Sequence, residues 1–317
     1  MTVYIAHRLF AAHDRALAAD LADRLAKKVG PNHVFLPFCD TDEEDLVAEV
    51  KGRRLFELDR DRLGSLDAMV AILHGPSLDD GVCMEIGYAA ASGVPVVVLT
   101  TDFQTYSLTE AGPHFEFPDP LLQAVANGIV RVAKLGPPTL PPAPSQSRFQ
   151  EFEARNVAQT NTALDAAVDA LLDLPNRAPL PTSSPATIGT SVYVEASPYT
   201  ASGRDHLADT CADAGHPVVV PRRFTASDPM SGALADLTAV RSAARLLADV
   251  SGPETPPGAA LLIGAALASG VRIAAFQPRP ALTHAHGREP NWRNLMIQYA
   301  VDAHLNDEEA VLSWLAV

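Results

Sequence analysis

Residues 68–99 begin with the apolar run Ala68-Met-Val-Ala-Ile-Leu73, continue through the helical pattern Met84-Glu-Ile-Gly-Tyr-Ala-Ala-Ala-Ser92, and end with a second apolar run, Val94-Pro-Val-Val-Val-Leu99. Neither apolar run alternates with polar residues, and a helix separates the two. This arrangement is typical of parallel strands that are covered on both faces. We therefore expect a doubly wound α/β domain, whose functional residues lie at the carboxyl ends of its strands.

The residues on either side extend this domain. Val3-Tyr-Ile-Ala6 is a β-branched run, and the pattern from about Ala12 to Val29 predicts an amphipathic helix. Val34-Phe-Leu-Pro37 predicts another strand, and a short helix is expected through Leu55, Leu58 and Leu63. The proline-rich stretch 136–144 cannot continue a helix, so the domain is expected to span residues 1–136.

The chain then repeats this pattern. Residues 137–190 are expected to hold the proline-rich segment, a helix from about Arg148 to Leu174 and a linker, and a second domain is expected over residues 191–317. At an offset of 177 residues, Gly75-Pro76 falls on Gly252-Pro253, Ile86-Gly87 on Ile263-Gly264 and Ala91-Ser-Gly-Val94 on Ala268-Ser-Gly-Val271. A gap-free match of this density predicts a duplicated domain. The fold class is therefore two flavodoxin-like doubly wound parallel-sheet domains that form a pseudo-dimer.

Three carboxylates of the first copy are missing from the second. The same offset places Asp67 on Ala244, Asp79 on Pro256 and Glu85 on Leu262, whereas Asp59 falls on Asp236. The glycines and apolar positions persist, so the three lost acids are expected to carry chemistry that the second copy no longer performs. The alternative for Asp67 and Asp79 is that they cap helices or loops.

Composition limits the class of protein. Hydrophobic residues make up 47% of the 317, and the net charge of −14 argues against a surface that coats nucleic acid. No run is long and apolar enough for a membrane span, and no signal peptide is recognised, so a cytoplasmic location is expected. Three dispersed cysteines suggest neither a disulfide framework nor a zinc site. His284-Ala-His286 offers two metal ligands without a third nearby, so neither a metal nor a cofactor is expected.

The segment from Asp67 to Ala89, with Asp79-Asp-Gly-Val-Cys-Met-Glu85-Ile-Gly-Tyr-Ala89 at its centre, resembles the signature of the nucleoside 2-deoxyribosyltransferase family. The resemblance implies that Glu85 is the nucleophile that attacks C1′ of the sugar and that Tyr4 orients it. It also implies that Asp79 and Asp67 contact the base and handle its proton. Gly81 and Met84 belong to the same motif and are expected to contact the substrate.

The resemblance also implies a composite site, because in this family an asparagine of an Asn-Leu-Met stretch reaches the sugar from a neighbouring subunit. Here Asn294-Leu-Met296 lies in the second domain, and the corresponding stretch of the first domain, Phe117 to Asp119, has no asparagine. The first domain keeps the acids and the second keeps the asparagine. One site per chain is therefore expected, assembled from both domains, and the other composite site is expected to be inactive. The alternative for Asn294 is a helix cap.

Two departures from the family pattern bear on the substrate. His7 and Arg8 stand where the family usually has glycine and proline, and Gln104 replaces an arginine. His7 and Arg8 are expected to bind either a 5′-phosphate of the substrate or nothing more than solvent.

The predicted function is cleavage of the N-glycosidic bond of a nucleoside or nucleoside 5′-monophosphate, followed by transfer of the sugar to another base. Two alternatives remain at this point: hydrolysis of the same intermediate by water, and nucleotide binding without turnover. The expected partners are a nucleoside or nucleotide and a free nucleobase, with neither nucleic acid nor a membrane. A monomeric pseudo-dimer or a homodimer is expected.

Overall fold

The computed structural model describes residues 1–40, 51–75, 77–136, 147–174, 189–196, 204–252, 254–278 and 293–317. His284 and His286 lie outside these residues. The described residues form two separate five-stranded sheets, and every pair of neighbouring strands in both sheets is parallel. The expected fold class is therefore confirmed.

The first sheet has the order β2-β1-β3-β4-β7. Its strands are β1 Val3–Ala6, β2 Val34–Phe35, β3 Ala68–Ile72, β4 Val96–Thr100 and β7 Gly128–Arg131. Its helices are α1 Ala12–Val29, α2 Lys51–Leu63, α3 Asp80–Ala91, α4 Pro120–Val125 and α5 Arg148–Leu172, with a 3-10 turn η1 Pro31–His33 and a small hairpin of β5 Tyr106–Ser107 and β6 His114–Phe115.

The second sheet has the order β12-β11-β10-β8-β9, which repeats that of the first sheet when each is counted from the amino-terminal strand of its domain. Its strands are β8 Val192–Glu195, β9 Val218–Val219, β10 Arg245–Asp249, β11 Arg272–Phe276 and β12 Ala303–Leu305. Its helices are α6 Arg204–Asp213, α7 Pro229–Ser242, α8 Pro257–Ala268, α9 Leu295–Ala300 and α10 Glu308–Leu315.

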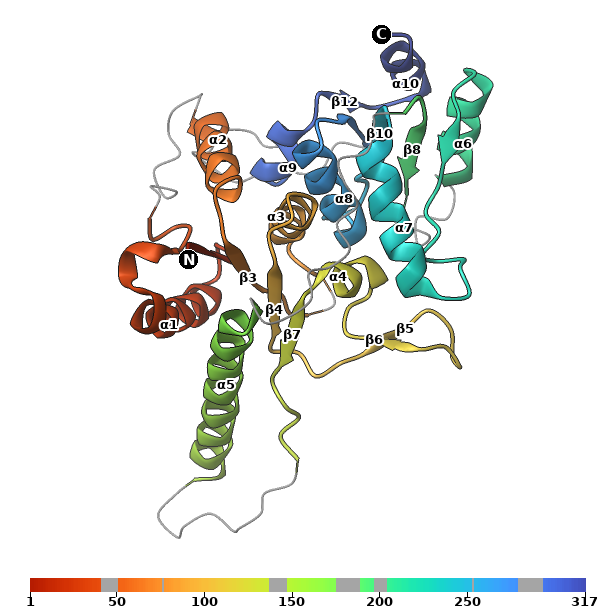
Figure 1. Ribbon diagram of the computed structural model, residues 1–317. Coiled ribbons are helices and arrows are strands. Elements are labelled where there is room, and N and C mark those ends of the chain that lie inside the picture. Colours follow the sequence, from red (N-terminus) through yellow and green to blue (C-terminus); the bar gives the residue numbers. More distant parts are fainter. Residues whose placement is uncertain are drawn as a thin grey trace.

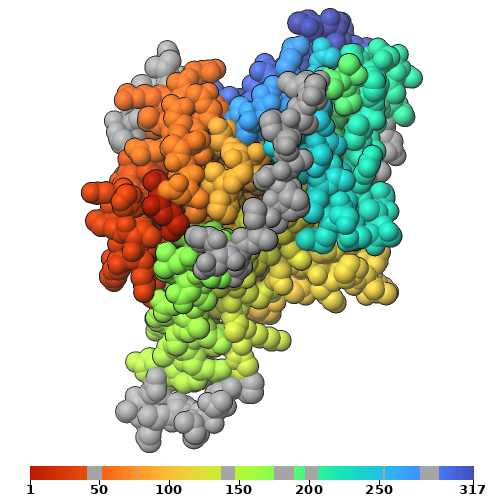
Figure 2. Space-filling model, in the orientation of Figure 1, coloured from red at the N-terminus to blue at the C-terminus, as the bar shows by residue number. Residues whose placement is uncertain are grey.

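The outer face of each sheet is covered by two helices of its own domain. Helices α1 and α5 pack on the first sheet, where Leu21 and Leu25 of α1 and Leu164 and Leu171 of α5 are buried against its strands. Helices α6 and α10 cover the second sheet in the same way. The helix expected between the two domains, α5, thus belongs to the core of the first, and it points away from the second domain (Figures 1 and 2).

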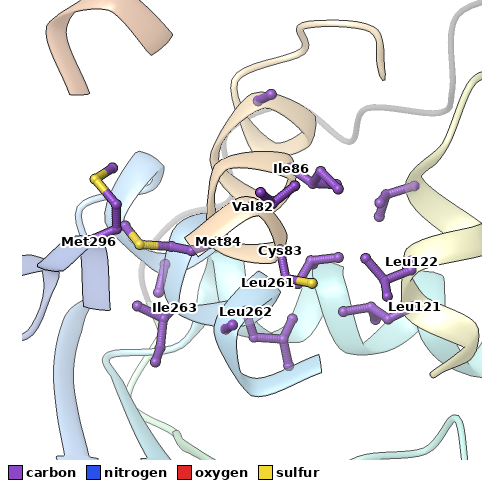
Figure 3. Packing of buried hydrophobic residues seen from close by; sticks show 14 of the residues in the cluster. Val82, Cys83, Met84, Ile86, Leu121, Leu122, Leu261, Leu262, Ile263 and Met296 are labelled. Atoms are coloured by element: carbon purple, nitrogen blue, oxygen red, sulfur yellow. The ribbon is translucent and has the colours of Figure 1, made fainter. Parts of the chain in front are cut away.

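The inner faces of the two sheets share one hydrophobic core. This core joins Tyr4 and Met69 of the first sheet to Tyr193 and Leu246 of the second through the helices α2, α3, α4, α7, α8 and α9. Figure 3 shows Met84 of α3 beside Met296 of α9, and Cys83 near Leu261 of α8. The two domains therefore meet through buried apolar side chains rather than through a solvated linker.

Helices α3 and α8 cross at two glycines. A Cβ atom on Gly87 would lie 1.8 Å from the carbonyl oxygen of Leu261, and one on Gly264 would lie 1.9 Å from that of Met84. Gly264 and Leu261 follow Gly87 and Met84 at the 177-residue offset, so the two contacts are the reciprocal pair expected across a two-fold axis. The backbones approach this closely because both positions lack a side chain.

Candidate functional site

The central contact of the candidate site joins β1 and α3. Glu85 lies on α3 and is only 7% exposed, and the buried Tyr4 hydroxyl donates a hydrogen bond to its Oε1 at 2.6 Å. The Tyr4 ring stacks on Phe35 of the neighbouring strand β2, with 5.3 Å between ring centroids. Tyr4 therefore has a fixed orientation, and its hydroxyl orients the carboxylate of Glu85.

Asp79 lies at the amino end of the same helix. It is the N-cap of α3, and its Oδ1 accepts a hydrogen bond from the backbone N–H of Val82 at 3.0 Å. The capping role considered from the sequence is therefore present. Burial and, to a lesser degree, the negative charge of Asp80 raise the pKa of Asp79 to about 6. A carboxyl group with such a pKa can hold a proton near neutral pH and can therefore act as a general acid.

Asn294 reaches this helix from the second domain. It is the N-cap of α9, and its Oδ1 accepts a hydrogen bond from the backbone N–H of Met296 at 2.9 Å. A Cβ atom on Gly81 would lie 2.8 Å from its Nδ2, so the amide packs directly on the first turn of α3. Gly81 and Glu85 are four residues apart and share one face of that helix. The two domains thus bring an amide and a carboxylate to one helix face.

Arg293 anchors the asparagine in this place. Its Nη2 donates hydrogen bonds to the carbonyl oxygens of Val250 and, at 2.9 Å, of Gly252, in the loop that follows β10. Arg293 is 6% exposed. The residue before Asn294 is therefore fixed to the second domain.

His7 and Arg8 follow β1 at its carboxyl end. His7 is 4% exposed, and burial lowers its pKa to about 4, so its imidazole is neutral at pH 7. Arg8 donates from Nε to Oδ2 of Asp14 at 2.6 Å, and this hydrogen bond raises the pKa of Arg8. The charges of Asp79 and Glu254 also act on Arg8, so the guanidinium lies near the candidate site and is paired on one side with Asp14.

Among the described residues, one group could hold a metal ion. His13, Asp14 and His74 bring one ligand atom each to within 4.8 Å of one another. The Nε2 atom of His74 lies 2.9 Å from Oδ1 of Asp14, and Arg8 binds the other oxygen of that carboxylate. This group could not be recognised along the chain, because His74 lies 60 residues beyond Asp14.

Asp67 does not lie with the other acids, which corrects its expected place in the site. It precedes β3, is exposed, and accepts a hydrogen bond from the backbone N–H of Thr2 at 2.6 Å, so it lies at the amino ends of β1 and β3. Asp79 follows the carboxyl end of the same strand. Five residues of strand separate the two edges by roughly 16 Å, since a strand rises about 3.3 Å per residue.

Met84 also differs from its expected role. It is fully buried, its side chain packs beside Met296, and its carbonyl oxygen faces Gly264 (Figure 3). The side chain of its neighbour Glu85 leaves α3 in a different direction, because consecutive helical side chains diverge by about 100°. Met84 thus stabilises the contact between the domains.

Asp59 is a buried acid that was not among the predicted site residues. It lies on α2, is 7% exposed, and corresponds to Asp236 of the second domain. Asp236 binds a buried arginine beside Glu195, the last residue of β8. The signal was present in the sequence, because an acid that persists at the same offset in both copies can serve both sites.

The comparisons with known proteins identify the family of the chain. The family model described as "Nucleoside 2-deoxyribosyltransferase" matches residues 3–169, which is more than half of the chain. The chain belongs to the nucleoside 2-deoxyribosyltransferase family. The match includes every element of the first domain through most of α5, and the family resemblance seen in the sequence is confirmed.

Solved structures resemble part of the chain. A conserved protein from Enterococcus faecalis V583 is 26% identical, with a TM-score of 0.36, and the match covers 41% of this chain and 91% of that one. A 2-desoxiribosyltransferase from Leishmania mexicana is 16% identical, with a TM-score of 0.34, and the match covers 40% of this chain and 98% of that one. No curated protein matches the chain. None of the helices in the described residues is long and apolar enough to cross a membrane.

Proposed function

We propose that the chain cleaves the N-glycosidic bond of a nucleoside or nucleoside 5′-monophosphate and transfers the sugar to a second base. The observation that carries the proposal is the buried Glu85 carboxylate, which Tyr4 orients on the helix face that also meets Asn294. Membership of the family supports glycosyl transfer in general. The absence of this acid from the second copy, where Leu262 stands, supports a chemical role rather than a structural one.

The reaction we propose has two displacements. A carboxylate oxygen of Glu85 attacks C1′, the bond between C1′ and the base nitrogen breaks, and its electron pair stays on the base. Protonated Asp79 gives its proton to the departing base, which leaves a glycosyl ester on Glu85. A second base then attacks C1′, the ester bond breaks and regenerates the carboxylate, and the proton of the incoming base returns to Asp79. Carboxylates commonly divide nucleophile and acid roles in this way.

The other residues serve binding in this proposal. The amide of Asn294 contacts the sugar from the side opposite to the base, and Gly81 leaves room for it. The neutral imidazole of His7 and the guanidinium of Arg8 lie at the carboxyl end of β1, where they can meet the 5′ end of the sugar. Arg8 would bind a 5′-phosphate with the part of its guanidinium that faces away from Asp14.

A base-exchange assay tests the proposal. A purine or pyrimidine 2′-deoxynucleoside, or its 5′-monophosphate, is incubated with a different free base, and the exchanged product is separated by chromatography. We expect Glu85→Gln to abolish exchange and Asp79→Asn to lower it by about 10²–10⁴-fold. Asp67→Asn serves as the matched control and should keep at least half of the wild-type rate.

Each outcome has a distinct meaning. Free sugar without exchanged product would mean that water, rather than a second base, receives the sugar. The proposed activity would then be hydrolysis instead of transfer. Unchanged turnover in Glu85→Gln would refute the nucleophile. Binding of nucleotides without release of base by the wild-type chain would leave only a binding function.

A further inference from the structure

The second composite site, the one expected to be inactive, contains the buried side chain of Arg223. Arg223 lies in the loop after β9 and is 1% exposed. Its guanidinium donates from Nε and Nη2 to the two oxygens of Asp119, at 2.8 and 3.0 Å, and from Nη2 to Oε1 of Glu195 at 2.6 Å. Nη1 donates to Oδ2 of Asp236 at 3.2 Å. Three carboxylates from both domains therefore surround one guanidinium.

These partners occupy the positions that correspond to the first site. Asp119 caps α4 by accepting from the backbone N–H of Leu121, just as Asn294 caps α9. A Cβ atom on Gly258 would lie 2.1 Å from Oδ2 of Asp119 and 2.5 Å from Nη2 of Arg223. Gly258 is the counterpart of Gly81, which meets Asn294 in the same manner.

The remaining partners follow the same correspondence. Glu195 ends β8 as Ala6 ends β1, and Asp236 corresponds to Asp59. The guanidinium thus lies between Glu195 at the end of β8, Gly258 of α8 and Asp119, which is the N-cap of α4 in the first domain. In the first site, that volume is bounded by Ala6, Gly81 and Asn294.

We propose that Arg223 is a built-in occupant of the second site, which closes that site to substrate and fastens the two domains together. Arg223 belongs to the second domain and Asp119 to the first, so their paired hydrogen bonds span the interface. Such bidentate contacts between a guanidinium and a carboxylate are directional as well as charged.

The contacts of Arg223 are important for stability because they are buried. Glu195 and Asp236 are each 1% exposed, and burial raises the pKa of Glu195 even though Arg223 opposes that shift. Removing the Arg223 guanidinium would leave these buried carboxylates without its countercharge, which is far more damaging than loss of an exposed ion pair.

Chemical rescue tests the proposal on the intact chain. Arg223→Ala should lower the melting temperature by about 10 °C, the usual effect of breaking a buried pair in a protein of this size. Methylguanidinium at millimolar concentration should bind the vacated place and restore several degrees. Methylammonium chloride at the same ionic strength should not. Arg222→Ala, which removes the exposed neighbouring arginine, is the matched control and should melt like the wild type with either salt.

The result that overturns the proposal is equally specific. An Arg223→Ala chain that melts within about 2 °C of the wild type would refute the proposed link between the domains. A response to methylguanidinium no larger than that of Arg222→Ala would refute it as well. If Arg223→Ala fails to fold, Arg223→Lys takes its place, because lysine keeps the charge without the planar fork. The melting temperature of Arg223→Lys should lie below that of the wild type. A melting temperature of Arg223→Lys equal to that of the wild type would also refute it.

The closure of the second site rests on the proposed function and has its own measurement. Calorimetric titration of Glu85→Gln with a 2′-deoxynucleoside should give one bound molecule per chain. Two bound molecules would contradict the closure. No binding at all would count against the proposed function, and the melting experiment would still decide whether Arg223 joins the domains.

Discussion

Glu85 lies on α3 and Asp79 is the N-cap of the same helix, yet their surroundings differ. Tyr4 donates a hydrogen bond to Glu85 and supports a carboxylate that can attack carbon. Asp79 accepts a backbone hydrogen bond that favours its ionised form, but burial and the neighbouring Asp80 outweigh it and raise the pKa to about 6. These different surroundings support the different roles that the proposed reaction gives the two acids.

The raised pKa of Asp79 predicts the pH dependence of the reaction. In the proposed reaction the protonated acid delivers the proton to the departing base, so kcat/KM should be maximal below about pH 6 and should fall as the pH rises above that value. Asp79→Asn should lose this limb of the profile along with most of its activity. Steady-state rates of both proteins between roughly pH 5 and 9 check the expectation. An identical decline in Asp79→Asn would assign the titration to another group.

The same pKa affects folding. Between the ordinary value of 3.8 and about 6, the folded chain keeps a proton that the unfolded chain loses. The contribution of Asp79 to stability therefore falls as the pH rises through this range and is lowest above pH 6. Buried functional acids commonly carry such a cost.

At the scale of secondary structure, α3 determines the site through its glycines. Gly81 admits Asn294, and Gly87 admits the backbone of α8. The helix is buried almost throughout, from Asp80 to Gly87. A single side chain added on either glycine position would therefore meet protein atoms rather than solvent.

Gly81→Ala should separate activity from stability. Its Cβ atom would lie 2.8 Å from the Asn294 amide, which must move away from the site. We expect base exchange to fall at least about 10-fold, whereas stability should change by about 1 kcal/mol or less, because the helix gains from alanine roughly what a disturbed cap loses. Gly64→Ala is the control, since its Cβ atom meets only ordinary contacts of 3.5 Å or more. Equal activity in the two variants would show that Asn294 has no part in turnover.

At the scale of the whole molecule, the two sheets enclose one core. The buried apolar cluster runs from Met69 of the first sheet to Leu246 of the second, and the buried pair of Arg223 and Asp119 spans the same interface. Tyr4 and Tyr193 occupy equivalent strands at its two sides. An assembly held together in this way should not unfold one domain at a time.

We therefore expect a single thermal transition for the wild-type chain, with equal calorimetric and van't Hoff enthalpies. Gly87→Ala should lower the transition temperature or split the transition, because its Cβ atom would lie 1.8 Å from the carbonyl oxygen of Leu261 and would force α3 and α8 apart. Differential scanning calorimetry of both proteins measures this. Two well-separated transitions in the wild type would mean that the domains fold independently.

The sequence by itself determined the parallel sheets, the repeat and the family, because apolar runs, helical periodicity and a local motif are all readable along the chain. The family resemblance also implied that Glu85 and Asn294 share one site, which stays a prediction. The helix predicted from Ala12 to Val29 has those bounds in the structure, and the helix predicted from Arg148 ends two residues earlier than expected.

The sequence already implied the ends of a strand at which its flanking acids lie, whereas only the tertiary structure decided which distant residues face one another. Asp67 precedes its strand and Asp79 follows it, so two acids of one motif lie at opposite edges of the sheet. Arg223 and Asp119 are 104 residues apart and meet only because two domains close on each other. Local patterns specify elements, whereas contacts between distant residues depend on how those elements pack, and no short stretch of sequence carries that information.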